Sequence, residues 1–217
     1  MDFPHPPPEA RAGLRALTRS DPDLAGIETA AGPLPWRRRA TGFEGLLQAI
    51  VGQQISSLAA AAIWRRLKAT PGALHPPALL AMDDEILRSA GLSRPKLAHA
   101  RALAGAFAEG RLDAGLLASL DDEEAIAAIA AVRGMGRWSA EIYLLFALQR
   151  PDVFPAGDLV LASAAADLKG LPARPGPAPL RILAEQWRPW RSLAARLLWH
   201  HWRHRTGRAA MDDLPAE

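Results

Sequence analysis

A short glycine turn between two apolar helical patterns constrains this chain most. Apolar residues recur at helical spacing over 125–131 and 139–148, and Gly134, Met135 and Gly136 lie between them. Glycine permits a tight turn and lets the backbone approach another molecule closely. The second helix then presents N–H groups and the positive end of its dipole at the turn. The pattern predicts an anion site, with phosphate as the expected anion, although an ordinary tight turn is the alternative.

The rest of the chain also predicts helices. Alanine and leucine dominate, valine is sparse, and no period-two alternation persists, so the expected fold class is all-α. Hydrophobic residues make up 49% of the 217 residues, which is ample for a core. Thr41 with Glu44, and Asp121 with Glu124, each match a capping box. Helices are therefore expected to begin after residues 41 and 121.

Charge is unevenly spread along the chain. The net charge is only +3, but Arg181 to Arg208 contains seven arginines and a single acid, Glu185. Such a cluster suits a polyanion, although a solvated helix face is the alternative. The chain has no cysteine, which excludes disulfides, thiolate metal sites and iron–sulfur clusters.

Four segments, taken in order, resemble the helix-hairpin-helix/GPD superfamily of base-excision DNA glycosylases. The resemblance is closest to the 3-methyladenine DNA glycosylase II branch and covers residues from about 21 to 202. The segments are Gly42 to Ser56, Gly91 to Lys96, Val132 to Asp158 and Trp187 to Ala195. The resemblance implies two helical lobes with an active cleft between them and a helix-hairpin-helix DNA-binding motif.

The same resemblance predicts how the chain is organised. Residues 1–40 are expected to pack with the C-terminal helices, with roughly the first eight, which are proline-rich, disordered. Residues 41–157 are expected to form the lobe that carries the hairpin. Residues 158–217 are expected to supply a helix led by Asp158 and the C-terminal helices. About 40 residues before Thr41 are too few for the N-terminal β-rich domain of some relatives.

Asp158 is the candidate catalytic residue. It precedes an apolar helical run, so the local pattern alone predicts a helix N-cap. The resemblance implies catalysis, because breaking an N-glycosidic bond builds positive charge on the sugar, which a carboxylate stabilises. No obvious partner acid is near; Asp152 is more typical of a loop surface. An alkylated purine is already cationic and leaves as a neutral base, so one carboxylate suffices.

Two tryptophans are candidates for the substrate pocket. Trp138 occupies the position at which bifunctional relatives carry a lysine nucleophile. Because an indole cannot form a Schiff base, we expect no AP-lyase activity. Trp138 and Trp190 are expected to stack on the cationic base through cation–π attraction. Core packing is the alternative for both residues.

Further residues are expected to contact DNA. By resemblance, the break after the central helix inserts a side chain into the gap left by the flipped base. Gln54 is the expected wedge, with Gln53 beside it; two solvated loop residues are the alternative. The hairpin residues expected to contact the DNA backbone, mainly through backbone amides, are Gly134, Met135, Gly136 and Arg137. The resemblance also implies a hard cation, monovalent or similar, on the hairpin carbonyls.

No metal site made by side chains is expected. His200, His201 and His204 are close in sequence, but there is no H-E-x-x-H glutamate and no acidic or cysteine partner nearby. These histidines are expected on a polar or phosphate-facing helix surface. No other cofactor is expected.

The sequence thus predicts a monofunctional glycosylase that flips and releases alkylated purines, of the 3-methyladenine or 7-methylguanine type, from duplex DNA. The alternatives are another lesion, such as hypoxanthine or uracil, a non-catalytic helix-hairpin-helix DNA-binding module, or a helical interaction protein. The expected partner is damaged double-stranded DNA, and the expected state is a monomer. No apolar run approaches the ~20 residues that span a bilayer, and no signal peptide is visible, so no membrane partner and a cytoplasmic location are expected.

Overall fold

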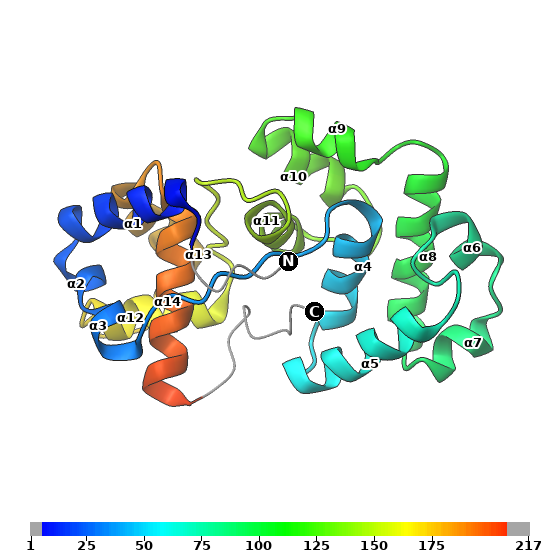
Figure 1. Cartoon of the computed structure of the whole chain (residues 1–217), viewed down its shortest axis with the longest axis horizontal. Coiled ribbons are helices and arrows are strands. Elements are labelled where there is room, and N and C mark those ends of the chain that lie inside the picture. The colour runs from blue at the N-terminus through cyan, green and yellow to red at the C-terminus, as the bar shows by residue number, and fades with distance from the viewer. Residues whose placement is uncertain (1–5, 208–217) are drawn as a thin grey trace. The chain divides into compact units, whose positions relative to one another are not determined.

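The computed structural model describes residues 6–207, which form helices without any strand (Figure 1). The all-α prediction is confirmed. The chain divides into two compact units: residues up to Arg38 together with those from Gln149 onward, and the continuous stretch 39–148. Within the described range, every helix lacks the combination of length and apolar character that crossing a membrane requires.

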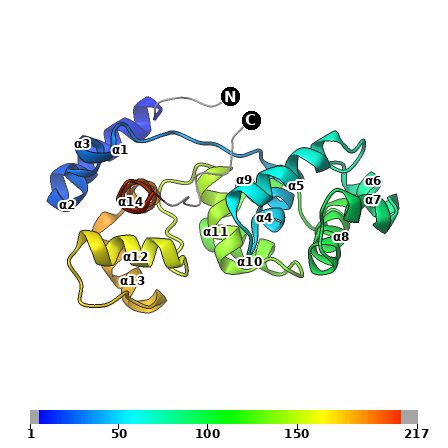
Figure 2. The same cartoon turned by 90° about the horizontal axis from the view of Figure 1, so that it is seen from below.

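The first unit is built from both ends of the chain around the C-terminal helix. Its elements are α1 (Pro8–Ser20), α2 (Pro22–Ala25), α3 (Ile27–Ala31), α12 (Leu159–Leu168), α13 (Pro177–Ala184), the 3-10 helix η1 (Glu185–Trp187) and α14 (Arg191–Thr206). Figure 2 shows α14 end-on, with α1 to α3 on one side and α12 and α13 on the other. Trp187 and Trp199 are fully buried in this core. The unit thus holds α12, which Asp158 precedes.

The expected disorder of the first eight residues is only partly within the described range. Residues 1–5 lie outside it. Pro6 is buried and α1 begins at Pro8, so the expectation is wrong for the end of that segment. A proline suits the first helical position, because its missing N–H would have no partner inside the helix and its φ is already helical.

The second unit is arranged around α4 (Gly42–Gly52), whose apolar side chains are almost all buried. Its other helices are α5 (Ser57–Ala69), α6 (Pro76–Ala81), α7 (Asp84–Ser89), α8 (Arg94–Ala108), α9 (Ala114–Ser119), α10 (Asp122–Ala130) and α11 (Arg137–Phe146). Helices α5, α8, α9 and α11 contact α4, while α10 packs along α11. The packing places the α10–α11 turn and the α4–α5 corner in one unit.

The boundaries of the units differ from the expected ones at residues 40/41 and 157/158. The chain leaves the second unit after Leu148 rather than at Asp158. The reason is that the loop before Asp158 is bound to α14. Ser192 Oγ accepts a hydrogen bond from the Val153 N–H and donates one to the Val153 carbonyl, both at 2.9 Å. The Asp152 carboxylate holds the Arg191 guanidinium at 2.9 Å.

Of the two expected capping boxes, one forms. The Asp121 carboxylate accepts from the Glu124 N–H at 2.8 Å, and Glu124 accepts from the Asp121 N–H at 3.0 Å. The box at Thr41 is wrong, since its side chain makes no capping hydrogen bond to the described residues. One N–H at the N-terminus of α4 has its acceptor on α11, since the Gly42 N–H donates to the Tyr143 hydroxyl at 2.7 Å.

Candidate DNA-binding and catalytic residues

The turn between α10 and α11 forms a tight hairpin. Gly134 has φ +88°, a conformation that favours glycine, and a Cβ there would collide with the His99 ring. The Met135 N–H donates to the Val132 carbonyl at 2.9 Å, and the Met135 side chain is buried. The expected role of Met135 as an amide donor to phosphate therefore needs revision. Gly136, which precedes α11, is exposed together with Arg133 and Arg137 on either side of it, whereas Ser139 in the first turn of α11 is buried.

Arg137 links the two hairpin helices. Its guanidinium donates to Glu123 at 2.8 Å and to Glu141 at 2.9 Å. The hydrogen bonds that the guanidinium donates to Glu123 in particular raise the pKa of Arg137 above its ordinary value. The side chain is still 47% exposed, but two carboxylates already balance its charge. Its contact with DNA remains a prediction, and the structure gives it a second role in holding α10 to α11.

The α4–α5 corner separates the two glutamines that were expected to act together. Gln54 is exposed and has φ +56°, an uncommon value for a residue other than glycine. Gln53 instead lies against the hairpin, where its Nε2 donates to the Gly134 carbonyl at 3.0 Å and to Ser139 Oγ at 3.2 Å. Insertion of Gln54 into DNA remains a prediction, while Gln53 has a structural contact that its sequence pattern did not indicate.

Apolar side chains beside Gln54 were missed by the sequence analysis. Ile55 is 38% exposed and Leu58, in the first turn of α5, is 83% exposed. In the sequence Ile55 lies in the break after the central helix and Leu58 in an ordinary apolar helical pattern, so no signal distinguished them. They place apolar surface next to the exposed corner.

Lys96 was also missed as a structural residue. Its Nζ donates to the Val51 carbonyl at the end of α4, and its side chain is almost completely buried. Burial lowers the pKa of this lysine below its ordinary value. A cation at a helix C-terminus is favourable because that end carries a partial negative charge. Lys96 therefore ties α8 to the end of α4, directly before the corner.

Asp158, in the first unit, caps the N-terminus of α12. Its Oδ1 accepts from the backbone N–H groups of Val160 and Leu161, both at 2.9 Å. The indole N–H of Trp199 points at the same oxygen from 3.4 Å. Asp158 is 7% exposed and lies at the positive end of the α12 dipole. The predicted N-cap is confirmed, and the carboxylate is held in one orientation.

The two candidate pocket tryptophans belong to different units. Trp138 is the second residue of α11 and is partly buried. Trp190 precedes α14 and is also partly buried; a Cβ on Gly13 of α1 would lie 2.8 Å from its ring. One part of the Trp190 indole therefore packs on α1. The stacking of either ring on a damaged base remains a prediction.

The secondary candidates near the C-terminus have structural partners. The Asp152 carboxylate binds Arg188 at 2.7 Å as well as Arg191, so this half-buried loop residue has two arginine partners. His200 is buried, with its Nε2 2.9 Å from the Gly32 carbonyl, so the expectation of a polar or phosphate-facing surface is wrong for it. Within residues 6–207 no group of side chains suited to a metal ion occurs.

A buried ion pair joins three elements of the first unit. Lys169 Nζ lies 2.7 Å from an Asp21 carboxylate oxygen, and the Trp187 indole N–H donates to the same carboxylate at 2.7 Å. Burial raises the pKa of Asp21, but the bonds from Lys169 and Trp187 outweigh it and leave the pKa below its ordinary value. The pair connects the start of α2 with the end of α12 and with η1.

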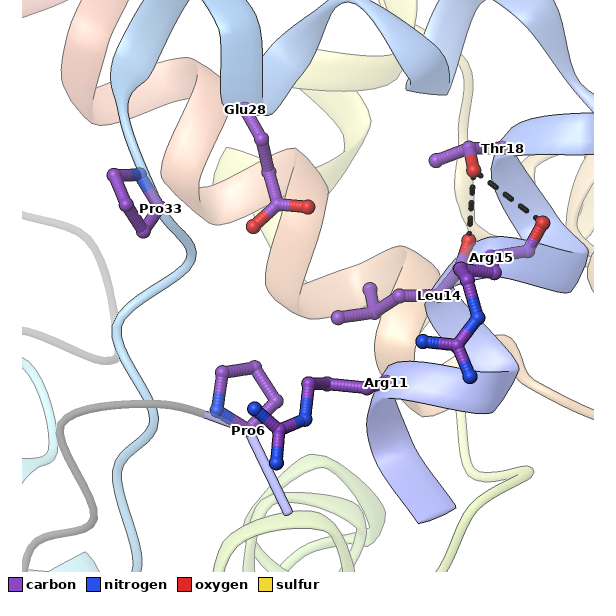
Figure 3. A pocket seen from close by; sticks show the side chains of 7 residues that line it. All are labelled: Pro6, Arg11, Leu14, Arg15, Thr18, Glu28 and Pro33. Atoms are coloured by element: carbon purple, nitrogen blue, oxygen red, sulfur yellow. Dashed lines mark hydrogen bonds between the residues drawn. The ribbon is translucent and has the colours of Figure 1, made fainter. Parts of the chain in front are cut away.

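A hollow of about 290 Å³ lies beside α1 in the first unit (Figure 3). The Glu28 carboxylate is on one side of it, and the side chains of Arg11 and Arg15 are on the other. Glu28 also accepts from the Leu34 N–H at 2.9 Å. None of the predicted site residues lines this hollow.

The tight glycine turn between α10 and α11, in an all-α fold, has the arrangement of a helix-hairpin-helix protein. The model of the HhH-GPD superfamily of base excision DNA repair proteins matches residues 47–191, and the chain belongs to this family. The resemblance stated from the sequence is thereby confirmed.

Curated relatives and solved structures carry related names. The chain is 34% identical to DNA-3-methyladenine glycosylase 1 of Schizosaccharomyces pombe over 72% of this chain and 71% of the relative. It is 29% identical to DNA-3-methyladenine glycosylase 2 of Escherichia coli over 73% of this chain and 57% of the relative. The structure of the S. pombe enzyme in complex with abasic DNA matches with a TM-score of 0.79 and 29% identity, covering 88% of this chain and 95% of that one. A DNA-3-methyladenine glycosidase from Bacillus halodurans matches with a TM-score of 0.76 and 29% identity, covering 93% and 92%.

Proposed function

We propose that this protein is a DNA-3-methyladenine glycosylase that hydrolyses the N-glycosidic bond of alkylated purines in duplex DNA. The observation that carries the proposal is the Asp158 carboxylate, which two backbone N–H groups and the Trp199 indole orient at the N-terminus of α12. The names of the relatives and of the matching structures support the same substrate class. A non-catalytic DNA-binding module would need the hairpin but not this carboxylate.

The chemistry follows from the charge that develops on the sugar. As the C1′–N bond breaks, the electron pair leaves with the alkylated base, which becomes neutral, and the sugar becomes cationic. A carboxylate already oriented near the sugar stabilises that cation without reorganising. Water oxygen then bonds to C1′, and Asp158 or solvent takes the proton. Because the base needs no protonation, no second acid is required.

The second unit supplies the proposed grip on DNA. Gly136 and the first turn of α11 offer N–H groups to a backbone phosphate, which suits a helix N-terminus. Gln54, exposed at the corner, is the proposed wedge in the duplex, with Ile55 and Leu58 as adjoining apolar surface. The cation on the hairpin carbonyls, the monomeric state, the lack of a membrane partner and the cytoplasmic location also remain predictions.

We further propose that the enzyme releases the base without cutting the strand. A lyase needs an amine near C1′ with a lowered pKa. Trp138 stands at the relatives' lysine position, Lys169 is bound by Asp21, and Lys96 is buried against the Val51 carbonyl. We therefore expect that borohydride traps no protein–DNA adduct during turnover. Efficient trapping that is lost when one lysine is replaced would contradict this.

A panel of labelled duplexes, each with one damaged base, tests the function. We expect release of 3-methyladenine and 7-methylguanine, scored as strand breaks that appear only after hot alkali. Release of only hypoxanthine or uracil would support the alternative glycosylase. If every duplex is bound but stays intact, the protein is a DNA-binding module.

A further inference from the structure

The two DNA-contacting elements of the second unit are joined by one side chain. Gln53 ends α4 in an extended conformation, directly before the exposed Gln54. Its amide nitrogen donates to the Gly134 carbonyl at 3.0 Å and to Ser139 Oγ at 3.2 Å. Gly134 belongs to the hairpin turn, and Ser139 belongs to the first turn of α11. The amide therefore spans from the corner to both parts of the hairpin.

Helix α8 supports the same junction from behind. Lys96 binds the Val51 carbonyl, two residues before Gln53, while the His99 ring lies against Gly134. The two side chains are three residues apart, so they project from one face of α8. The corner and the hairpin thus both contact α8, and Gln53 is a direct hydrogen-bonded link between them.

We infer that Gln53 is a positioning residue that couples the seating of the hairpin on the DNA backbone to the insertion of Gln54. The inference rests on the proposed function. A hydrogen bond to the Gly134 carbonyl sets where the next residue projects, because Gln53 and Gln54 are adjacent in a short corner. Without the link, the hairpin still grips phosphate, but Gln54 is no longer held in line with the gap left by the flipped base.

The test compares binding to an undamaged duplex with binding to the same duplex carrying a tetrahydrofuran abasic-site analogue. Gln53→Leu keeps the volume and removes the donor. Because a net hydrogen bond is modest in strength, we expect it to reduce the preference for the abasic duplex roughly 5- to 10-fold. Affinity for the undamaged duplex should stay within about 2-fold. The hydrogen bond from the Met135 N–H to the Val132 carbonyl and the Arg137 ion pairs still hold the hairpin in shape. Gln186→Leu, at an exposed glutamine of η1, is the matched control and should bind like the wild type.

A double-mutant cycle separates coupling from direct contact. If Gln53 acts through Gln54, then Gln54→Ala should lose the same preference, and the double variant should lose no more than about 2-fold beyond it. Additive losses would make Gln53 a DNA contact in its own right and overturn the inference. Equal losses on both duplexes would overturn it as well, because they would show a general structural role.

The remaining outcomes are also decisive. If thermal unfolding shows that Gln53→Leu is poorly folded, Gln53→Asn replaces it, since its amide is one methylene too short to reach the Gly134 carbonyl. A Gln53 variant that keeps the full preference for the abasic duplex overturns the inference about Gln53 and leaves the proposed function standing. A wild-type protein that shows no abasic preference and releases no base overturns the proposed function first.

Discussion

At the scale of single residues, Asp158 combines a structural and a proposed chemical role. The same oxygen that caps α12 receives the Trp199 indole N–H. The local sequence predicted the cap, because Asp before an apolar helical run is a favoured N-cap. The contact with Trp199 joins residues 41 positions apart, so no local pattern could have predicted it.

Replacing Asp158 separates the two roles. Asn is also a favoured N-cap, so we expect Asp158→Asn to cost less than about 1 kcal/mol in stability. Loss of the negative charge should slow base release about 10² to 10³-fold while abasic DNA still binds. Asp113→Asn is the matched control, because Asp113 caps α9 through the same two backbone positions and should leave the rate unchanged. Single-turnover release of 3-methyladenine checks both; wild-type rates in Asp158→Asn would end the assignment.

Because the pKa of the buried Asp21 carboxylate is lowered, we expect the protein to lose stability at acid pH. Its pKa in the folded protein lies below the unfolded value of 3.8, so its contribution is present above pH 3.8 and is lost as the pH falls through the folded pKa. Asp21→Asn should lower the free energy of unfolding by about 2 kcal/mol at pH 7. The variant should also lose less stability as the pH falls, since it has no carboxylate to protonate at this position. Melting temperatures between pH 3 and pH 7 measure both effects. Parallel curves for the two proteins would contradict the prediction.

At the scale of elements, the sequence predicted helices and turns better than the contacts between them. The Asp121–Glu124 box formed because both partners lie within one turn. The Thr41–Glu44 pair has the same spacing and forms no such cap, while Tyr143, which is remote in sequence, accepts from the neighbouring Gly42 N–H. Gln53 shows the same limit: its residue type suggested a DNA contact, while its partners in the hairpin were invisible to any local pattern.

The hairpin offers a matched pair of glycines. Gly134→Ala forces φ +88° on a residue with a side chain and drives its Cβ into the His99 ring, so we expect a loss of about 1–3 kcal/mol or more and weaker DNA binding. Gly136 has φ −109°, and a Cβ there meets nothing within 4 Å. Gly136→Ala should therefore lose only the N-cap preference for glycine, about 1 kcal/mol or less, and melt closer to the wild type than Gly134→Ala. Thermal unfolding of the two variants side by side is the measurement; equal melting temperatures would refute the close approach of His99.

At the scale of the whole molecule, binding to undamaged DNA should depend on salt and not on sequence. Each neutralised phosphate contributes about 0.9 to the slope of log affinity against log salt. Arg137→Gln should change that slope by clearly less than this amount, because Glu123 and Glu141 already balance its charge. Titrations of two unrelated duplexes at several salt concentrations test both statements. A slope lowered by about 0.9 in the variant would instead show that the Arg137 guanidinium itself neutralises a phosphate.

The division of the chain has a consequence for the order of events during synthesis. The second unit is one continuous stretch, and its ends meet where the Arg39 N–H donates to the Phe146 carbonyl at 2.9 Å. Once that stretch has emerged from the ribosome, all the helices that pack together in the second unit are available, so the unit can fold while translation continues. Helices α1 to α3 are made first, yet they must wait for α14, against which they pack, to appear last. The nascent protein should therefore complete the unit with the proposed phosphate grip before the unit with the proposed catalytic carboxylate.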